Sequence, residues 1–165
     1  GYHKLLSENL LLEYSKFFDL RTCSLRVFSA YGEGLKKQLF WDIHQKSLIN
    51  GKIVLYGTGR ESRDFIYISD LVNIVNLIIE KGSFSGEVYN IGNGEEVTIK
   101  EAAKTFLDRM GNGNNIEIVF SNENKVGDPT NWKADIQKIV TLGYQRSYTF
   151  KEGIDNYCKW LKELE

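Results

Sequence analysis

The sequence is poor in proline, cysteine and histidine, and each scarcity excludes a kind of protein. A single proline in 165 residues, with no low-complexity stretch, gives no sign of an interdomain hinge. The two cysteines, Cys23 and Cys158, are too few and too far apart for a disulfide framework or a zinc site. The two histidines, His3 and His44, do not have metal-ligand spacing, so we predict no metal site.

Long apolar runs and a charge excess of one sign are also lacking. No apolar segment approaches the roughly 20 residues that a membrane-spanning helix needs. The formal net charge of -1 gives no argument for binding nucleic acid or an anionic membrane, and we recognise no charged-then-apolar secretion leader. We therefore expect a soluble protein of the reducing cytoplasm, with no nucleic-acid partner and no membrane partner.

What the sequence does contain is a nearly regular alternation of helix and strand patterns. Apolar residues at helical spacing predict helices over 2–17, 36–51, 69–82, 98–111 and 149–164, with a short helix inside 128–143. Runs rich in β-branched and aromatic residues predict strands over 22–32, 52–57, 87–92 and 116–120, with a short extended piece over 64–68. This alternation predicts an α/β architecture.

Three G-x-G turns, in "GTGRES", "GNGEEV" and "GNGNN", invite comparison with a dinucleotide-binding loop. "GNGEEV" follows a predicted strand and precedes a predicted helix, as that motif requires. However, Val97 stands where the third glycine belongs, and a side chain there hinders the close approach of helix and strand. We therefore interpret it as a tight turn and predict no dinucleotide loop within this chain.

Several stretches in a fixed order carry a more specific pattern. "GYHK" opens the first helix, "LRVFSAYGEG" follows as a strand and turn, and "KIVLYGTGRESRDFIYISD" forms a strand, loop and extended piece. "EVYNIGNGEEVTIKE" and "NKVGDPTNWKADIQKI" come later in the chain. Together they resemble the extended short-chain dehydrogenase/reductase family, specifically its NAD-dependent sugar-nucleotide epimerases and dehydratases, which are UDP-glucose 4-epimerase-like enzymes.

In that family a helix carries the pattern Y-x-x-x-K, and Lys4 takes the lysine position. The tyrosine would precede Gly1, so the resemblance implies that the chain is the carboxyl-terminal half of a larger protein. Residues four apart share one helix face, where an ammonium favours the charged form of a neighbouring phenol and so its proton transfer. The resemblance also implies that Lys4 binds the nicotinamide ribose. The alternative is a solvated helix lysine.

The resemblance assigns substrate contacts to further residues. Ser29 takes the usual asparagine position in the strand that runs along the nicotinamide and the substrate diphosphate. Tyr56 would lie against the nucleotide base, and Arg63 would clamp the diphosphate with its planar guanidinium fork. The alternatives are core packing for Tyr56 and an ion pair with Asp64 or Asp70 for Arg63.

Three more positions follow from the same resemblance. Lys125 stands in place of the usual arginine, which keeps a point charge for phosphate but loses the fork geometry. Asp128 would meet the ribose, and Gln38, near the start of its helix, would contact the diphosphate. The alternative for the "NENKVGD" stretch is a solvated loop.

The implied enzyme binds a nucleotide-diphospho-sugar, forms a keto-sugar and uses NAD or NADP as a hydride store. We expect residues 1–32 to be the last helix and strand of the NAD(P)-binding Rossmann domain and residues 33–165 to be the small α/β substrate-binding subdomain. A later strand and helix can return from it to the Rossmann sheet. The cofactor would be bound mainly upstream of Gly1, so we expect the chain alone to be inactive.

The first helix is apolar on more than one face, because Leu10, Leu11 and Leu12 are consecutive. The resemblance implies a homodimer built on this helix, and the alternative is burial within its own domain. A rival interpretation of the whole chain is a non-catalytic module that binds a sugar nucleotide or a protein and keeps Arg63 and Lys125 for phosphate. A second rival is a chain that has lost its function and retains only the fold.

Overall fold

Helices and strands alternate along most of the chain. The structure, a computed structural model, describes residues 1–49, 51–113, 115–123, 127 and 129–164. Its elements are α1 (Tyr2–Phe18), β1 (Thr22–Val27), β2 (Ser29–Tyr31), α2 (Gln38–Ser47), β3 (Lys52–Leu55), β4 (Ser62–Arg63), β5 (Phe65–Tyr67), α3 (Ile68–Lys81), β6 (Ser85–Ile91), β7 (Val97–Thr98), α4 (Ile99–Met110), β8 (Glu117–Phe120), α5 (Gln137–Leu142) and α6 (Phe150–Lys162).

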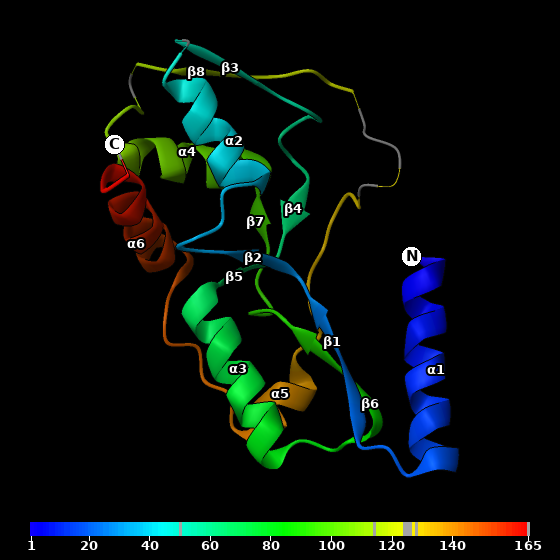
Figure 1. Ribbon diagram of the computed structural model, residues 1–165. Coiled ribbons are helices and arrows are strands. Elements are labelled where there is room, and N and C mark those ends of the chain that lie inside the picture. Colours follow the sequence, from blue (N-terminus) through cyan, green and yellow to red (C-terminus); the bar gives the residue numbers. More distant parts are fainter. Residues whose placement is uncertain (50, 114, 124–126, 128, 165) are drawn as a thin grey trace.

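The strands join in pairs that are distant in sequence. Within the described residues β1 pairs with β6, β2 with β5 and β3 with β8, all in parallel, while β4 and β7 form a short antiparallel pair. Parallel neighbours need a long crossover connection, and α3 provides the last part of the connection from β1 to β6. The pairs and their helices form two lobes that follow each other along the long axis of the molecule (Figure 1).

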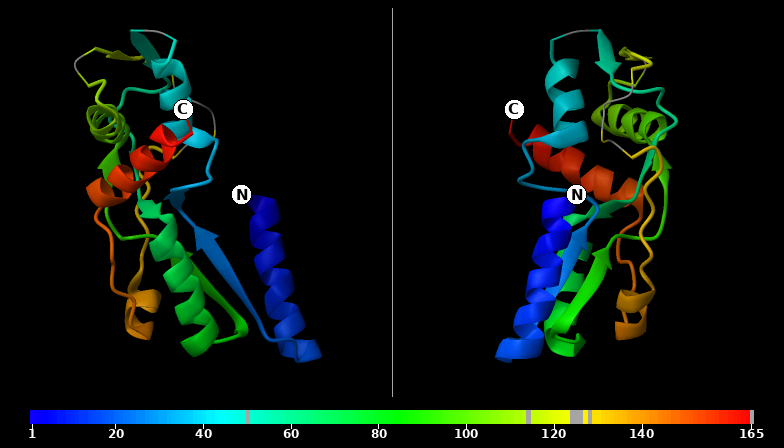
Figure 2. Two further views of the ribbon diagram at one scale, coloured as in Figure 1. Left: turned by 60° about the vertical axis from the view of Figure 1, so that its left-hand side comes forward. Right: turned by 90° about the vertical axis from the view of Figure 1, so that its right-hand side faces the viewer.

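The lower lobe of Figure 1 is built on the β1–β6 pair. Helix α1 lies on one side of this pair, and α3 and α5 lie on the other (Figure 2). Among the described helices none has the length and apolarity needed to cross a bilayer. The buried apolar residues of this lobe lie between the strands, α3 and α5: Ile66, Ile74, Ile78, Tyr89, Ile91, Ile139 and Tyr144.

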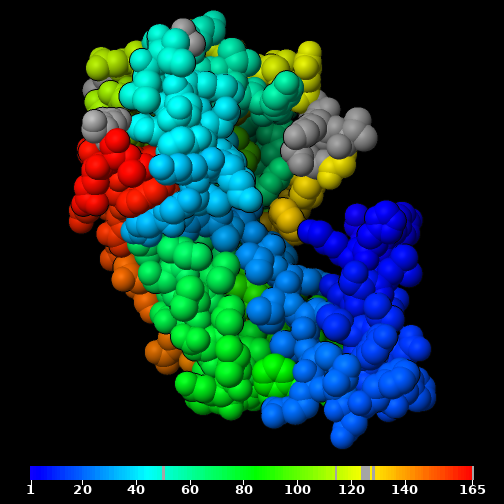
Figure 3. Space-filling model, in the orientation of Figure 1, coloured from blue at the N-terminus to red at the C-terminus, as the bar shows by residue number. Residues whose placement is uncertain are grey.

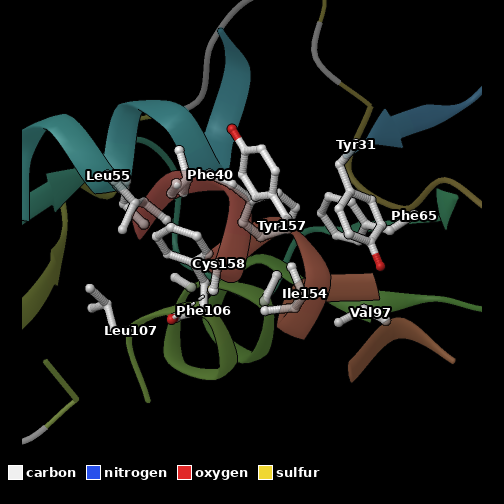
Figure 4. Packing of buried hydrophobic residues seen from close by; sticks show 14 of the residues in the cluster. Tyr31, Phe40, Leu55, Phe65, Val97, Phe106, Leu107, Ile154, Tyr157 and Cys158 are labelled. Carbon is white, nitrogen blue, oxygen red and sulfur yellow. Dashed lines mark hydrogen bonds between the residues drawn. The ribbon is translucent and has the colours of Figure 1, made fainter. Parts of the chain in front are cut away.

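The upper lobe contains a larger apolar core than the lower lobe, and this core lies between α2, α4 and α6 (Figure 4). Aromatic rings fill much of it, with Tyr31, Phe40, Phe65 and Tyr157 all buried. Two buried tyrosines keep a polar partner, as buried hydroxyls require. The Tyr31 hydroxyl donates to the Phe150 carbonyl at 2.9 Å, and the Tyr157 hydroxyl donates to the Leu35 carbonyl at 2.7 Å.

Several element boundaries differ from those that the sequence predicts, and two of the differences have a clear physical reason. The expected strand over 22–32 is divided at Phe28, because the Phe28 N–H donates to the Ile91 carbonyl of β6 while the next N–H donates to Asp64. One apolar strand pattern therefore serves two partner strands, β6 and β5. The expected helix over 36–51 ends at Ser47, whose hydroxyl donates to the His44 carbonyl at 2.7 Å, and not at the predicted cap.

Candidate functional site

The predicted substrate residues Ser29 and Arg63 lie at a junction where β2, β4 and β5 meet. Asp64 separates β4 from β5, and its backbone carbonyl accepts a hydrogen bond from the Ser29 N–H at 3.0 Å. Ser29 also lies opposite Phe65 in the parallel β2–β5 pair. The hydrogen bond joins Ser29 to Asp64, which lies 35 positions further along the chain and directly follows Arg63, so the backbone brings Ser29 and Arg63 together.

The carboxylate of Asp64 is the centre of this junction. The residue is 0% exposed. Its Oδ1 accepts from the Asn93 N–H at 2.7 Å, and its Oδ2 accepts from the Gly94 N–H at 2.8 Å and the Ala134 N–H at 3.0 Å. Burial raises the pKa of Asp64, and the backbone hydrogen bonds oppose that shift. The carboxylate thus joins the turn after β6 and the segment before α5 to the β4–β5 connection.

Arg63 directly precedes Asp64 in the sequence and is half-buried, and its guanidinium binds other partners. Its Nη1 donates to the carbonyls of Ser62 at 2.7 Å and Pro129 at 2.8 Å. These bonds fix the plane of the guanidinium next to the segment that begins at Pro129. A guanidinium with a fixed plane is well suited to recognise phosphate oxygens in pairs.

The segment from Pro129 to Ala134 runs along the junction. The Ser62 N–H donates to the Thr130 carbonyl at 2.9 Å. The Trp132 ring packs on the ring of Phe28, with 5.0 Å between the ring centroids, and Phe28 directly precedes Ser29 in the chain. Ala134 then reaches the Asp64 carboxylate. This segment, Ser29 and Arg63 therefore form one connected group of residues.

The other predicted substrate residues are not part of that group. Tyr56 follows β3 and is 71% exposed, which excludes the core packing that the sequence left open for it. Gln38 is the first residue of α2, is exposed and has a φ of 68°. Lys125 and Asp128 lie outside the described residues.

Lys4 is exposed on the first turn of α1. One turn further, Glu8 binds Arg26 of β1 through two bonds, Nε to Oε1 at 2.7 Å and Nη2 to Oε2 at 2.6 Å. Because residues four apart share a helix face, Lys4 lies on the same side of α1, toward the carboxyl end of β1. The surface is hollowed between this end of α1 and the segment near residue 130 (Figure 3).

Two G-x-G turns hold carboxylates of the chain itself. The N–H groups of Thr58 and Gly59 both donate to the Glu61 carboxylate at 2.9 Å, which lowers the pKa of Glu61. The N–H groups of Asn93 and Gly94 donate to Asp64. Because these donors already have an anion, neither turn presents them to a nucleotide phosphate. For "GNGEEV" this agrees with its interpretation as a tight turn.

Two surface hollows lie elsewhere on the described part of the chain. One lies between β1, β6 and α5, and the other between α4 and α6. Neither hollow is lined by a predicted site residue. The lining residues are Arg26, Val88, Asn90, Asp135 and Lys138 in the first hollow, and Arg109, Asp155, Cys158, Lys159 and Lys162 in the second.

Comparison with known proteins decides the family. Residues 1–92 match the profile of the NAD dependent epimerase/dehydratase family. The chain belongs to this family. The resemblance and the Rossmann-type α/β fold that the sequence predicts are thereby confirmed. A Bacillus subtilis member named as an uncharacterised UDP-glucose epimerase, YtcB, is 30% identical over 166 residues, which cover 99% of this chain and 52% of that protein.

Solved structures of family members have the same fold. The UDP-glucuronic acid 4-epimerase of Bacillus cereus, in complex with UDP-glucuronic acid and NAD, is 28% identical with a TM-score of 0.85, over 98% of this chain and 52% of that one. The dTDP-glucose 4,6-dehydratase of Bacillus anthracis, in complex with NAD, is 25% identical with a TM-score of 0.81, over 94% and 49%. The predicted cofactor, NAD, is that of the family and of both complexes. The chain spans about half the length of the curated relatives it matches.

Proposed function

We propose that the chain supplies the substrate-binding part of an NAD-dependent enzyme that epimerises or dehydrates a nucleotide-diphospho-sugar. The observation that carries the proposal is the junction of Ser29, Arg63 and the segment from Pro129, in a chain of this family. The named relatives and complexes support a sugar linked to UDP or dTDP.

Each residue has a physical role in the proposed site. The Arg63 guanidinium, oriented by its bonds to Ser62 and Pro129, binds the diphosphate with charge-assisted hydrogen bonds. Ser29 offers a hydroxyl to the sugar or phosphate, and the exposed Tyr56 ring covers the base. The remaining contacts proposed for the diphosphate and ribose come from Gln38, Lys125 and Asp128.

Lys4, at the amino end of α1, is placed where it could bind a dinucleotide cofactor. Ligands of open parallel sheets bind beyond the carboxyl ends of the strands, and Lys4 lies toward that end of β1. We propose that the Lys4 ammonium binds the ribose hydroxyls of the cofactor and favours the anionic form of a neighbouring phenol. When bound, NAD supplies the hydride transfer, and the protein supplies position and charge. The rest of the dinucleotide would be bound by a part of the enzyme outside residues 1–165, so the chain alone binds substrate without turnover.

Calorimetry with UDP-glucose and dTDP-glucose tests the substrate proposal. We expect the Arg63→Ala variant to lose roughly tenfold to a hundredfold in affinity, because hydrogen bonds to charged groups contribute about 1.5–3 kcal/mol. Arg109→Ala is the matched control, since Arg109 lies on α4 and pairs with Asp155 at 3.3 Å. We expect this control to bind as the unaltered chain does.

Three outcomes would change the proposal. If the folded natural protein binds neither nucleotide sugar, the substrate class is wrong. If it binds them with Arg63-dependent affinity but shows no NAD-dependent turnover, it is a sugar-nucleotide-binding module instead. Equal affinities for Arg63→Ala and the unaltered protein would remove Arg63 from the site.

We propose a second copy of the chain as the partner of α1. None of the described residues of α1 is fully buried, although the helix packs on β1 and β6. Many exposed apolar side chains on one helix are typical of a subunit interface. Its exposed apolar side chains are Leu5, Leu6, Leu10, Tyr14, Phe17 and Phe18.

A further inference from the structure

We infer that Asp64 is a positioning residue of the proposed substrate site, one that fixes Arg63 and the segment from Pro129 to Ala134 in place for a nucleotide diphosphate. This inference rests on the proposed function. It concerns a residue that would not touch the substrate.

The Asp64 carboxylate is a negative acceptor in a place where three backbone N–H groups converge. Asn93 and Gly94 approach it from the turn after β6, and Ala134 approaches it from the segment before α5. All three are donors, so the site needs acceptors on both oxygens. An asparagine at this position keeps one acceptor and turns an NH₂ group toward a donor. Buried donors without a partner each cost about 1–3 kcal/mol.

The carboxylate is coupled to Arg63 through the segment that both residues hold. Arg63 binds the carbonyl of Pro129 at 2.8 Å, and Asp64 binds the N–H of Ala134 at 3.0 Å. The segment is thus fixed at two ends by two consecutive residues of one strand connection. The backbone carbonyl of Asp64 also holds Ser29. Loss of the Ala134 bond therefore leaves the segment held from the Ser62 and Arg63 side, through Thr130 and Pro129, and loosens the Pro129 carbonyl that orients the Arg63 guanidinium.

Asp70 offers a matched comparison. It is also 0% exposed, and its carboxylate also accepts backbone N–H groups, from Ser147 at 3.0 Å and Tyr148 at 3.1 Å. The segment that it holds leads into α6 and includes no predicted substrate residue. Asp70→Asn therefore damages a buried carboxylate of the same kind without touching the Arg63 junction.

The test compares Asp64→Asn with Asp70→Asn in the natural full-length protein. Urea unfolding measures stability, and calorimetry with UDP-glucose measures affinity. We expect both variants to be destabilised, Asp64→Asn to lose at least about tenfold in affinity, and Asp70→Asn to stay within about twofold of the unaltered protein. In the Arg63→Ala background we expect Asp64→Asn to cost little further affinity, because the two residues act through one contact.

Three results would overturn the inference: normal affinity in folded Asp64→Asn, an equal loss in Asp70→Asn, or additive losses in the double variant. No UDP-glucose binding by the unaltered protein would instead refute the proposed function. If Asp64→Asn does not fold, hydrogen exchange on the unaltered protein decides. We then expect UDP-glucose to slow the exchange of the Asn93, Gly94 and Ala134 N–H groups, which bind Asp64, but not of the Ser147 and Tyr148 N–H groups, which bind Asp70. Equal exchange of the first three N–H groups with and without UDP-glucose refutes the inference.

Discussion

At the scale of single residues, close contacts at one helix glycine show how the upper lobe is fitted together. Gly153 lies inside α6, where the Tyr31 hydroxyl passes over it to reach the Phe150 carbonyl at 2.9 Å. A Cβ on Gly153 would overlap that hydroxyl oxygen and would lie 3.1 Å from the Cβ of Tyr67. The glycine therefore serves the packing of β2 and β5 on α6 and not the helix itself.

We predict that Gly153→Ala destabilises the chain, although alanine is the better helix former by about 1 kcal/mol. Overpacking of this kind costs about 1–3 kcal/mol. Tyr31→Phe removes the overlapping oxygen, so the double variant should be more stable than the sum of the two single changes. Urea unfolding of the four proteins measures this coupling. Strictly additive effects would show that the Tyr31 hydroxyl does not limit the space at Gly153.

The residues of the candidate site were predictable from the sequence to different degrees. Ser29 and Arg63 are recognisable because they stand in short local patterns, and the structure brings them together. The role of Asp64 was missed, since its three donors come from positions 93, 94 and 134. One signal was available: a carboxylate at the start of the apolar run "DFIYI" must find donors if that run is buried.

At the scale of elements, most helices and strands follow from periodicity and capping residues. Thr149 and Glu152 form the complete capping box that their spacing predicts, and the Thr98 side chain accepts from the Glu101 N–H. The division of the strand at Phe28 could not be predicted, because it depends on a change of partner from β6 to β5. Pairing between distant strands leaves little trace in a local pattern.

The bond between α1 and β1 predicts a pH dependence of stability. Hydrogen bonding to Arg26 lowers the pKa of Glu8, so the ion pair contributes above the ordinary carboxyl pKa of about 4.3. Its contribution is lost as the pH falls through the lowered pKa of the folded protein. Since Arg26 is half exposed, we expect only about 0.2–1 kcal/mol.

Urea unfolding of the unaltered chain and of Glu8→Gln, at about pH 7 and about pH 3, tests this. The stability difference between the two proteins should shrink on acidification, because the unaltered chain loses its ion pair there. Arg26→Gln should behave as Glu8→Gln does. A constant difference between the proteins at both pH values would mean that the bond contributes nothing to folding.

At the scale of the whole molecule, the apolar side of α1 predicts self-association. We expect the natural protein to sediment as a dimer and Leu6→Glu to raise the dissociation constant roughly tenfold or more, because it replaces about 1.5–3 kcal/mol of apolar burial by a buried charge. Ile79→Glu is the control, since Ile79 on α3 is 64% exposed and Leu6 is 63% exposed. Analytical ultracentrifugation measures both variants. A monomeric natural protein would favour burial of α1 within its own polypeptide.

The pairing of the strands also determines the order in which the chain can fold. Thr22 faces Ser85, Ser29 faces Phe65, and Lys52 faces Glu117, so the loop that closes β3 on β8 overlaps the loop that closes β1 on β6. Contacts between residues so far apart make folding slow, on the order of milliseconds to seconds. During synthesis β3 emerges before β8 and has no partner until β8 has been made. The ribosome must therefore release the chain as far as β8 and α6 before the upper lobe closes, and the apolar strand β3 needs shielding from aggregation until then.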